Sequence, residues 1–268
     1  MNVDPLPWWQ HHTSATIAEL ATHDGVAILP LSAIEQHGPH LPLDTDYRIG
    51  LGLLQAAYGQ LDDAPSLAIL PPMAIATSNE HLGFPGTLTL QPETAMAALR
   101  DIGISVARSG LRRLLIANSH GGNTAICDLV GLDLRRQHDM LVVKHHYFQQ
   151  PLPATLGIPA EEQRHGLHGG LLETAMMQVL APQQVRMGAA ADAGSLGTTL
   201  ESELEILQPE GRAAFSWMAG DLNPTGVVGN ARAATPELGA TLIAHYASSL
   251  AATIRDTARF DLTHLGTL

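Results

Sequence analysis

Cysteine and aromatic residues are scarce in this sequence. Its 268 residues include one cysteine, Cys127, and aromatic side chains make up 4% of the chain. A single cysteine excludes an intramolecular disulfide. Its apolar neighbours Ile126 and Leu129 indicate that Cys127 lies on a buried helix face rather than acting as a nucleophile. With so few aromatic residues, the hydrophobic core must be mainly aliphatic.

Positive charge is also scarce. The chain has 14 Lys plus Arg against 26 Asp plus Glu, so its formal net charge is −12 and its pI is about 5.5. This balance argues against nucleic acid or an anionic membrane as a partner, because both bind basic surfaces. No segment reaches the roughly 20 apolar residues that span a bilayer. Residues 1–10 lack the basic and apolar parts of a signal peptide, so we expect a cytoplasmic protein.

Short apolar runs alternate with amphipathic segments along the chain. Without a visible linker, residues 1–268 are expected to form one domain. Strands are predicted at 26–31, 66–70, 114–117 and 140–143, and helices from residue 14 and at 47–58, 92–109, 124–137, 172–180 and 236–251. The repeated strand-loop-helix units predict a three-layer α/β/α sandwich with a mostly parallel central sheet.

The stretch from Glu35 to Asp46 directly follows the first predicted strand and is rich in carboxylates and imidazoles. Open α/β folds bind ligands beyond the carboxyl ends of their strands, where Glu35 and His37 would lie. Residues 35 and 37 would point to opposite sides of an extended loop, so two neighbouring ions suit the spacing better than one. Pro39 and Pro42 would stiffen the loop and could hold Asp46 back against the other two side chains.

Two further junctions add candidate ligands. His120 follows the predicted strand 114–117, and His168 and Glu173 lie at the start of the predicted helix 172–180. Oxygen and imidazole ligands without thiolate suit Zn²⁺, Mn²⁺ or Fe²⁺ and disfavour a structural zinc site. Three carboxylates against two divalent ions leave about one positive charge, which would stabilise a bound hydroxide and an oxyanion. The candidate metal ligands at these junctions are Glu35, His37, Asp46, His120, Glu173 and His168.

These residues resemble the creatininase family, also called creatinine amidohydrolases. The family signature E-x-H-G-x-H-L-P-x-x-T-D is met from Glu35 to Asp46. The resemblance continues in the segments Glu80–Thr87, Asn118–Asn123, His168–Thr174 and Asp221–Gly229. The matches run from about residue 26 to residue 240, which is nearly the whole chain.

The resemblance implies a creatininase-like fold and a dinuclear metallohydrolase that opens C–N bonds of amides, often in cyclic substrates. Glu35 and His120 would hold one ion, His37 and Glu173 the other, and Asp46 would bridge them. The ions would be Zn²⁺ and/or Mn²⁺, with Fe²⁺ as a further candidate.

The resemblance also implies catalytic roles and an assembly. His168 would be the proton shuttle that gives a proton to the leaving nitrogen, and Glu173 would be catalytic as well as a ligand. The substrate would be a small-molecule amide. A closed homo-oligomer is expected, a hexamer or another multiple of three.

One motif departs from creatininase proper. There, a Tyr-Glu pair follows the histidine that corresponds to His120, and that glutamate is a metal ligand. Here Gly121 and Gly122 occupy these positions, so the ligand must come from elsewhere, and Glu173 is the candidate. The substrate-gating tryptophan of the family is not evident near Tyr147. The chain therefore resembles the glycine-form branches, which include a formamide-cleaving deformylase and a peptidase that trims the mycofactocin precursor.

Three functions stay open at this point. The leading hypothesis is an amidohydrolase that cleaves a small amide with a hydroxide bridging two metal ions. A peptidase of the mycofactocin-precursor type or a formamide deformylase on the same site is the first alternative, and the loops 73–87 and 147–165 would distinguish them. A non-catalytic metal or ligand-binding module is the second alternative.

The remaining histidines and one acidic run are interpreted as structural or surface residues. His40 is expected to stiffen the loop 35–46, and three histidines near the proposed site are expected to be structural: His145, His146 and His165. Surface or packing positions are expected for His11, His12, His23, His138, His245, His264, Glu201, Glu203 and Glu205.

Overall fold

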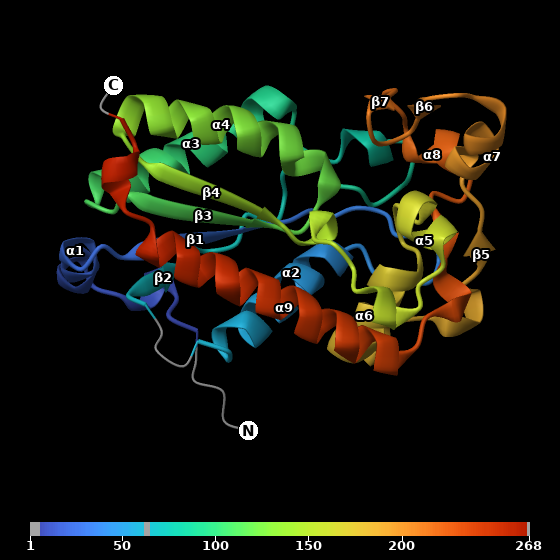
Figure 1. The fold of residues 1–268 in the computed structure, drawn as a ribbon, viewed down its shortest axis with the longest axis horizontal. Helices are drawn as coiled ribbons and strands as arrows, with labels where there is room; N and C mark the ends of the chain where they lie inside the picture. The colour runs from blue at the N-terminus through green and yellow to red at the C-terminus, as the bar shows by residue number, and fades with distance from the viewer. Residues whose placement is uncertain (1–5, 62–64, 267–268) are drawn as a thin grey trace.

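A parallel sheet lies at the centre of the computed structural model, which describes residues 6–61 and 65–266. Its strands are β1 (Val26–Leu31), β2 (Leu67–Ile69), β3 (Arg113–Asn118) and β4 (Leu141–His146), in the spatial order β2-β1-β3-β4 (Figure 1). All three strand pairs are parallel. The apolar runs predicted as strands therefore form strands, and every residue of β1 is buried, as its uninterrupted hydrophobic sequence requires.

One face of the sheet is covered by α1 (Ser14–Thr22), α3 (Pro92–Arg108) and α4 (Thr124–His138). The core on this face is aliphatic, and Cys127 lies within it. Burial raises the pKa of the Cys127 thiol to about 12, so the thiol is protonated at neutral pH. This environment agrees with a packing role for Cys127.

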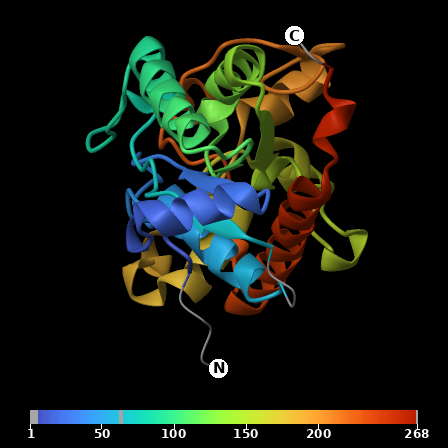
Figure 2. The same cartoon turned by 90° about the vertical axis from the view of Figure 1, so that its left-hand side faces the viewer.

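The other face is covered by α2 (Thr45–Tyr58) and α9 (Pro236–Arg259), and α6 (Leu171–Leu180) packs against both of these helices. Figure 2 shows α3 and α4 on one side of the sheet and α2 and α9 on the other. The predicted three-layer α/β/α sandwich is confirmed.

Short elements gather beyond the carboxyl ends of the strands (Figure 1). They are α5 (Ala160–His165), β5 (Asp192–Ala193), α7 (Leu196–Glu203), β6 (Leu207–Gln208), β7 (Ala213–Ala214), α8 (Ala219–Leu222) and β8 (Gly229–Asn230). Single-turn 3-10 helices are η1 (Trp9–His11), η2 (Asn79–His81), η3 (Gly121–Asn123), η4 (Tyr147–Gln149), η5 (Ala154–Leu156), η6 (Pro182–Gln184), η7 (Met187–Ala189), η8 (Ala231–Ala233) and η9 (Leu262–His264).

Three predicted boundaries were wrong. Helix α2 begins at Thr45, so Asp46 lies in its first turn and not in the preceding loop. Strand β4 runs on through His146, because this segment keeps pairing with β3 as far as Asn118. Helix α9 continues about two turns past residue 251, where Ile254 still packs into the core.

Two wider expectations concern the whole chain. None of the helices within the described residues is long and apolar enough to cross a bilayer. Residues 1–5 of the N-terminal segment considered above lie outside the described residues. The single-domain organisation and the cytoplasmic location stay predictions.

The close approach of α9 to α6 gives a testable prediction for stability. A methyl group at Gly239 would collide with the carbonyl oxygen of Ala175 in α6. Gly239→Ala should therefore push the two helices apart and lower the free energy of unfolding by about 1–3 kcal/mol, the usual cost of overpacking. Urea denaturation followed by circular dichroism measures this change.

Gly220→Ala in α8 is the matched control, because a methyl group there meets nothing within 4 Å. This control should leave stability unchanged or raise it by up to about 1 kcal/mol, since alanine favours helix more than glycine does. Equal unfolding midpoints for the two variants would contradict the close packing of α6 against α9.

Candidate metal centre

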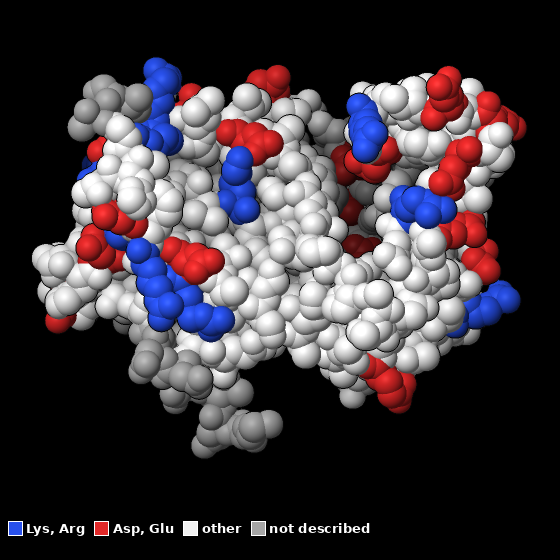
Figure 3. All heavy atoms as spheres, viewed as in Figure 1, with Lys and Arg blue, Asp and Glu red and all other residues white. Residues whose placement is uncertain are grey.

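A cavity of about 940 Å³ opens beyond the carboxyl ends of the strands. Figure 3 shows it as a hollow in the surface with acidic side chains inside. The cavity is lined by residues that follow β1 and β3, by η2 and η4, and by the segment that leads into α6. No lysine or arginine is among the described residues that line it. This position at the edge of the sheet is the one that the sequence predicted.

Glu35 is fully buried in the loop after β1, with an exposed fraction of 0%. Its backbone N–H donates to the carbonyl of Leu43 at 3.0 Å, which closes the loop that leads to α2. Burial raises the pKa of Glu35 to about 8, and the positive charge of His120 opposes that shift. The carboxylate of Glu35 therefore needs a nearby positive charge to remain ionised at neutral pH.

His37 lies beside two carboxylates. Its Nδ1 donates to the carbonyl of Glu35 at 3.1 Å, so Nε2 is the nitrogen that faces Asp46 Oδ1 at 3.2 Å and Glu173 Oε2 at 3.8 Å. Burial lowers the pKa of His37, but the neighbouring carboxylates, Asp46 foremost, raise it to about 10. The surroundings of Nε2 thus favour a cation strongly.

Asp46 lies between two imidazoles. The first turn of α2 presents one of its oxygens, Oδ1, to His37 and the other, Oδ2, to Nδ1 of His120 at 3.2 Å. Despite burial, the two imidazoles lower the pKa of Asp46 far below its usual range, so it stays ionised. Asp46 therefore contacts His37 with one oxygen and His120 with the other. It meets His120 at Nδ1.

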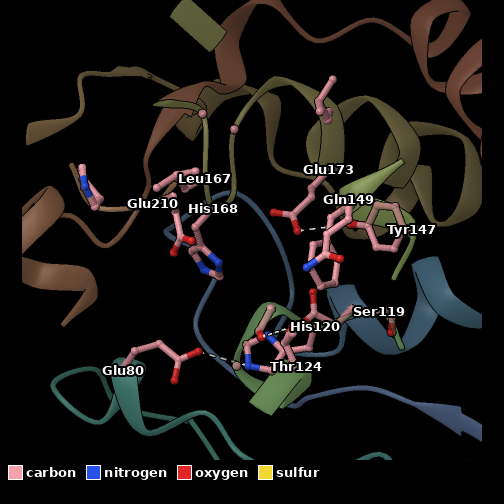
Figure 4. Close-up of a pocket in the computed structure, with 18 of the residues that line it drawn as sticks. Glu80, Ser119, His120, Thr124, Tyr147, Gln149, Leu167, His168, Glu173 and Glu210 are labelled. Atoms are coloured by element: carbon pink, nitrogen blue, oxygen red, sulfur yellow. Dashed lines mark hydrogen bonds and ion pairs between the residues drawn. The ribbon is translucent and has the colours of Figure 1, made fainter. Parts of the chain in front are cut away.

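His120 follows β3, whose residue Asn118 pairs with the last residue of β1. This register brings the loops after the two strands side by side. His120 Nε2 lies 3.2 Å from Glu35 Oε2 and 3.2 Å from Glu80 Oε1. Figure 4 shows Glu80 reaching His120 from the opposite side of the cavity to Glu173.

Glu173 lies in the first turn of α6, as the sequence predicted. Its Oε2 accepts a hydrogen bond from the backbone N–H of Gly169 at 2.6 Å, and its Oε1 accepts one from the hydroxyl of Tyr147 at 3.5 Å (Figure 4). These two donors hold the carboxylate toward His37. Burial raises the pKa of Glu173, so its ionised form also depends on positive charge nearby.

His168 is held more firmly than its glycine neighbours suggest. Its Nε2 donates to the carbonyl of Gln36 at 2.7 Å, and its ring lies between those of His37 and His81, with both centroid distances at 4.2 Å. Its backbone pairs with Val228. These contacts hold the ring in place, so it cannot swing toward a leaving group from this position, and Nδ1, 3.6 Å from Glu35 Oε1, is its free nitrogen.

Sequence reasoning did not identify Glu80 and His81 as site residues, although they lie within the resembling segment 80–87. Both belong to η2, in the loop after β2. The amide of Gln36 donates to His81 Nδ1 at 2.9 Å, and His81 Nε2 lies 3.3 Å from Glu35 Oε1. Glu80 is ionised, because its hydrogen bond with His120 lowers its pKa despite burial. The family motif was the one signal that could have found them.

The remaining candidate histidines lie outside the cluster. His40 Nε2 bonds to the hydroxyl of Thr174 at 2.9 Å and so ties the loop to α6. His145 contacts Thr253, His146 contacts Asn118, and His165 pairs with Glu201, which also pairs with Arg164. These contacts agree with structural roles.

The cluster fits divalent metal ions. Four buried atoms of the cluster have no hydrogen-bond partner among the described residues. They are Glu35 Oε1, Glu35 Oε2, His37 Nε2 and Asp46 Oδ2. Such atoms are costly unless a cation binds them, and the described residues of the cavity lining include no lysine or arginine. Three groups bring their ligand atoms within 4.8 Å of one another: Glu35, Glu80 and His120; His37, Asp46 and Glu173; and Glu35, His37 and His168. Oxygen and imidazole donors suit Zn²⁺ and Mn²⁺.

Comparison with known proteins finds one family and two kinds of relative. The family model described as creatinine amidohydrolase matches residues 10–254. The mycofactocin precursor peptide peptidase of Mycobacterium tuberculosis is 38% identical over 126 residues, covering 44% of this chain and 50% of the relative. The match thus spans about half the length of that relative. The creatinine amidohydrolase of Pseudomonas putida is 27% identical over 205 residues, covering 71% of this chain and 75% of the relative.

Solved structures show the same fold. A crystal structure of creatinine amidohydrolase superposes with a TM-score of 0.73 at 24% identity, covering 96% of this chain and 100% of the other. Neighbours of this fold include a zinc form and a manganese form of creatininase, each 23% identical to this chain.

Divalent ions should stabilise the folded protein. An ion that binds the native cluster but not the unfolded chain adds about 2.7 kcal/mol at a free concentration of one hundred times its Kd. We therefore expect the midpoint of thermal unfolding of metal-free protein to rise when Mn²⁺ or Zn²⁺ is added and to fall again with a chelator. Differential scanning calorimetry at fixed pH measures the shift.

Two carboxylate variants test where this stabilisation arises. Glu35→Gln removes a buried charge from the cluster and should abolish most of the shift. Asp44→Asn should keep the shift, because Asp44 pairs with Arg48 at 2.8 Å on the surface of α2. An equal shift in the wild type and the Glu35 variant would contradict a metal site at this cluster.

Proposed function

This chain belongs to the creatininase family, and from this premise we propose that it is a metal-dependent hydrolase that cleaves the C–N bond of an amide. The observation that carries the proposal is the buried cluster of carboxylates and imidazoles whose atoms lack partners at the inner end of the cavity. A binding module would not need this combination of ion ligands and a free imidazole nitrogen beside an open cavity. We therefore favour catalysis over binding alone.

Two divalent ions fit the cluster best. We assign Glu35 and His120 to one ion and His37 and Glu173 to the other, with Asp46 contacting an imidazole from each half. Zn²⁺ and Mn²⁺ are the favoured ions, in keeping with the donor set and with the forms of creatininase named above, and Fe²⁺ is a further candidate. The bridging role of Asp46 stays a prediction.

The side chains supply the proton transfers. Bound divalent ions polarise a carbonyl and lower the pKa of water. The pKa of His168 is held well below its ordinary value by burial and by the neighbouring His37 and His81, so its ring is neutral. Because Nε2 is committed to the carbonyl of Gln36, Nδ1 is the atom that can accept a proton from water and pass it to the leaving nitrogen.

A peptide is the second candidate substrate. The cavity of about 940 Å³ is much larger than a small cyclic amide needs and lies at the upper end of the range for drug-sized ligands. Its walls include the aromatic side chains of Phe148, Phe215 and Trp217, which can cover apolar groups of a longer substrate. The peptidase relative supports this alternative.

A closed homo-oligomer, a hexamer or another multiple of three, is a separate proposal that rests on family resemblance alone.

A substrate panel with matched variants tests the proposal. Metal-loaded protein should hydrolyse at least one amide among creatinine, formamides, cyclic ureides and short peptides, and metal-free protein should hydrolyse none. His168→Asn should keep both ions and lower kcat by roughly 10²–10⁴-fold, the range for losing a proton carrier. Glu173→Gln should weaken one ion and abolish turnover together.

His40→Asn is the matched histidine control, because His40 contacts Thr174 rather than the cluster. It should keep kcat near that of the wild type. If His168→Asn lost an ion while Glu173→Gln kept both, the assigned roles would be reversed. A metal-loaded wild type that turned over no member of the panel would count against hydrolysis of these amide classes.

A further inference from the structure

Glu162 is a buried carboxylate outside the metal cluster. It belongs to α5, has an exposed fraction of 8% and lines the large cavity. Backbone N–H groups bind both of its oxygens, because Leu171 N–H donates to Oε1 at 2.8 Å and Asn230 N–H donates to Oε2 at 2.8 Å. A carboxylate can accept at both positions, whereas a carboxamide can accept at only one. The pair of contacts is therefore possible only with an acid at position 162.

The two N–H groups that Glu162 binds belong to the segments that hold His168. Val228 N–H donates to the carbonyl of His168 at 2.7 Å, and His168 N–H donates to the carbonyl of Val228 at 3.2 Å. Leu171 lies three residues after His168, and Asn230 lies two residues after Val228. The carboxylate of Glu162 thus ties the two segments together just beyond the point where they pair.

Three glycines leave the room that this carboxylate fills. A Cβ atom would lie 2.5 Å from Glu162 Oε1 at Gly166, 2.7 Å from it at Gly170 and 2.6 Å from it at Gly229. The two backbones also approach each other closely, since a Cβ atom at Gly170 would lie 3.1 Å from the Cα atom of Gly229. Any side chain at these positions would displace the carboxylate or push the segments apart.

We propose that Glu162 is a positioning residue that holds the imidazole of His168 in place for proton transfer. The inference rests on the proposed function, in which Nδ1 of His168 carries the proton. One end of this side chain is fixed by the bond from Nε2 to the carbonyl of Gln36 at 2.7 Å, and Figure 4 shows the ring pointing into the cavity. The other end is fixed by the backbone of residues 166–170, which Glu162 anchors.

Glu173 is held mainly by other contacts, so the role of Glu162 can be separated from ion binding. Glu173 lies in the first turn of α6, and α6 packs against α2 and α9. These helices should hold the backbone of Glu173 when the segment before α6 loosens. One contact involves that segment, because Gly169 N–H donates to Glu173 Oε2 at 2.6 Å. Loss of the Glu162 carboxylate should therefore affect proton transfer far more than ion occupancy.

Kinetics and ion content of the full-length, Zn²⁺-loaded chain test the proposal, with the amide of the panel that the wild type hydrolyses fastest. Glu162→Gln keeps the size of the side chain but turns an amide nitrogen toward one of the two backbone N–H groups. Its kcat should fall by roughly 10–100-fold, as for a catalytic group that is misplaced by about 1 Å. Its KM and its two bound ions, counted by elemental analysis, should stay as in the wild type.

Glu161→Gln is the matched control, because it changes the neighbouring, exposed glutamate, whose Oε1 accepts from the hydroxyl of Thr198 at 3.0 Å. This control should keep the kcat of the wild type. Gly170→Ala is a second way to displace the Glu162 carboxylate and should also lower kcat. Gly188→Ala should not, because a methyl group there meets nothing within 4 Å. If Glu162→Gln does not fold, Gly170→Ala takes its place in every measurement.

A double-mutant cycle separates positioning from a general structural defect. If Glu162 acts through His168, the two substitutions remove the same contribution. The kcat of the double variant Glu162→Gln/His168→Asn should then equal that of His168→Asn alone. A general defect would instead multiply the two losses.

The ring of His168 can also be followed without an activity assay. In Zn²⁺-loaded protein labelled with ¹⁵N-histidine, NMR distinguishes a protonated Nε2 from an unprotonated Nδ1. The signal that is absent from His168→Asn identifies this ring. Glu162→Gln should shift or broaden this signal, whereas Glu161→Gln should leave it unchanged.

A wild-type kcat in Glu162→Gln, or multiplied losses in the double variant, would overturn the proposal. An unchanged His168 signal would do the same, and so would the loss of an ion, because Glu162 would then act on the metal cluster. A wild type that hydrolysed no amide would contradict the proposed function. The NMR signal would then decide on its own whether Glu162 holds the ring.

Discussion

Buried negative charge without a protein cation is the constraint on which this structure depends. Glu35 is fully buried, its two oxygens have no hydrogen-bond partner, and no lysine or arginine is among the described residues that line the cavity. Leaving such charges uncompensated would cost several kcal/mol each. The imidazoles of His37 and His120 supply positive charge in the absence of ions, because the neighbouring carboxylates hold the pKa values of both imidazoles above the ordinary one. Divalent ions take over this compensation and compete with protons for the same atoms.

The fold supplies the geometry for this cluster. The parallel pairing of β1 with β3 ends at Leu31 and Asn118, so the loops that carry Glu35 and His120 leave the sheet together. The first turns of α2 and α6 then bring in Asp46 and Glu173 with their helix N-termini, which favour negative charge nearby. The close packing of α6 on α9 therefore fixes a ligand as well as the core.

The parts of this arrangement that follow from local sequence were predictable. The apolar run of β1 identified a buried strand, and the motif that begins at Glu35 identified the ligands that follow it. The start of α2 at Thr45 was missed, because its first residues complete a polar motif. Glu80 was missed because its contact with His120 depends on tertiary clearance at Gly122, which no periodicity records. The fixed ring of His168 was missed for a similar reason, since its partner is the backbone of a loop 132 residues away.

Anomalous diffraction from crystals loaded with Zn²⁺ or Mn²⁺ tests the dinuclear centre most directly. The structure predicts two anomalous peaks per chain. One should lie beside Glu35 and His120, the other beside His37 and Glu173, and Asp46 should lie next to both. A single peak, or none, at saturating metal would contradict the dinuclear centre. So would Glu35 oxygens that are hydrogen-bonded to protein atoms instead of lying within bonding distance of an ion.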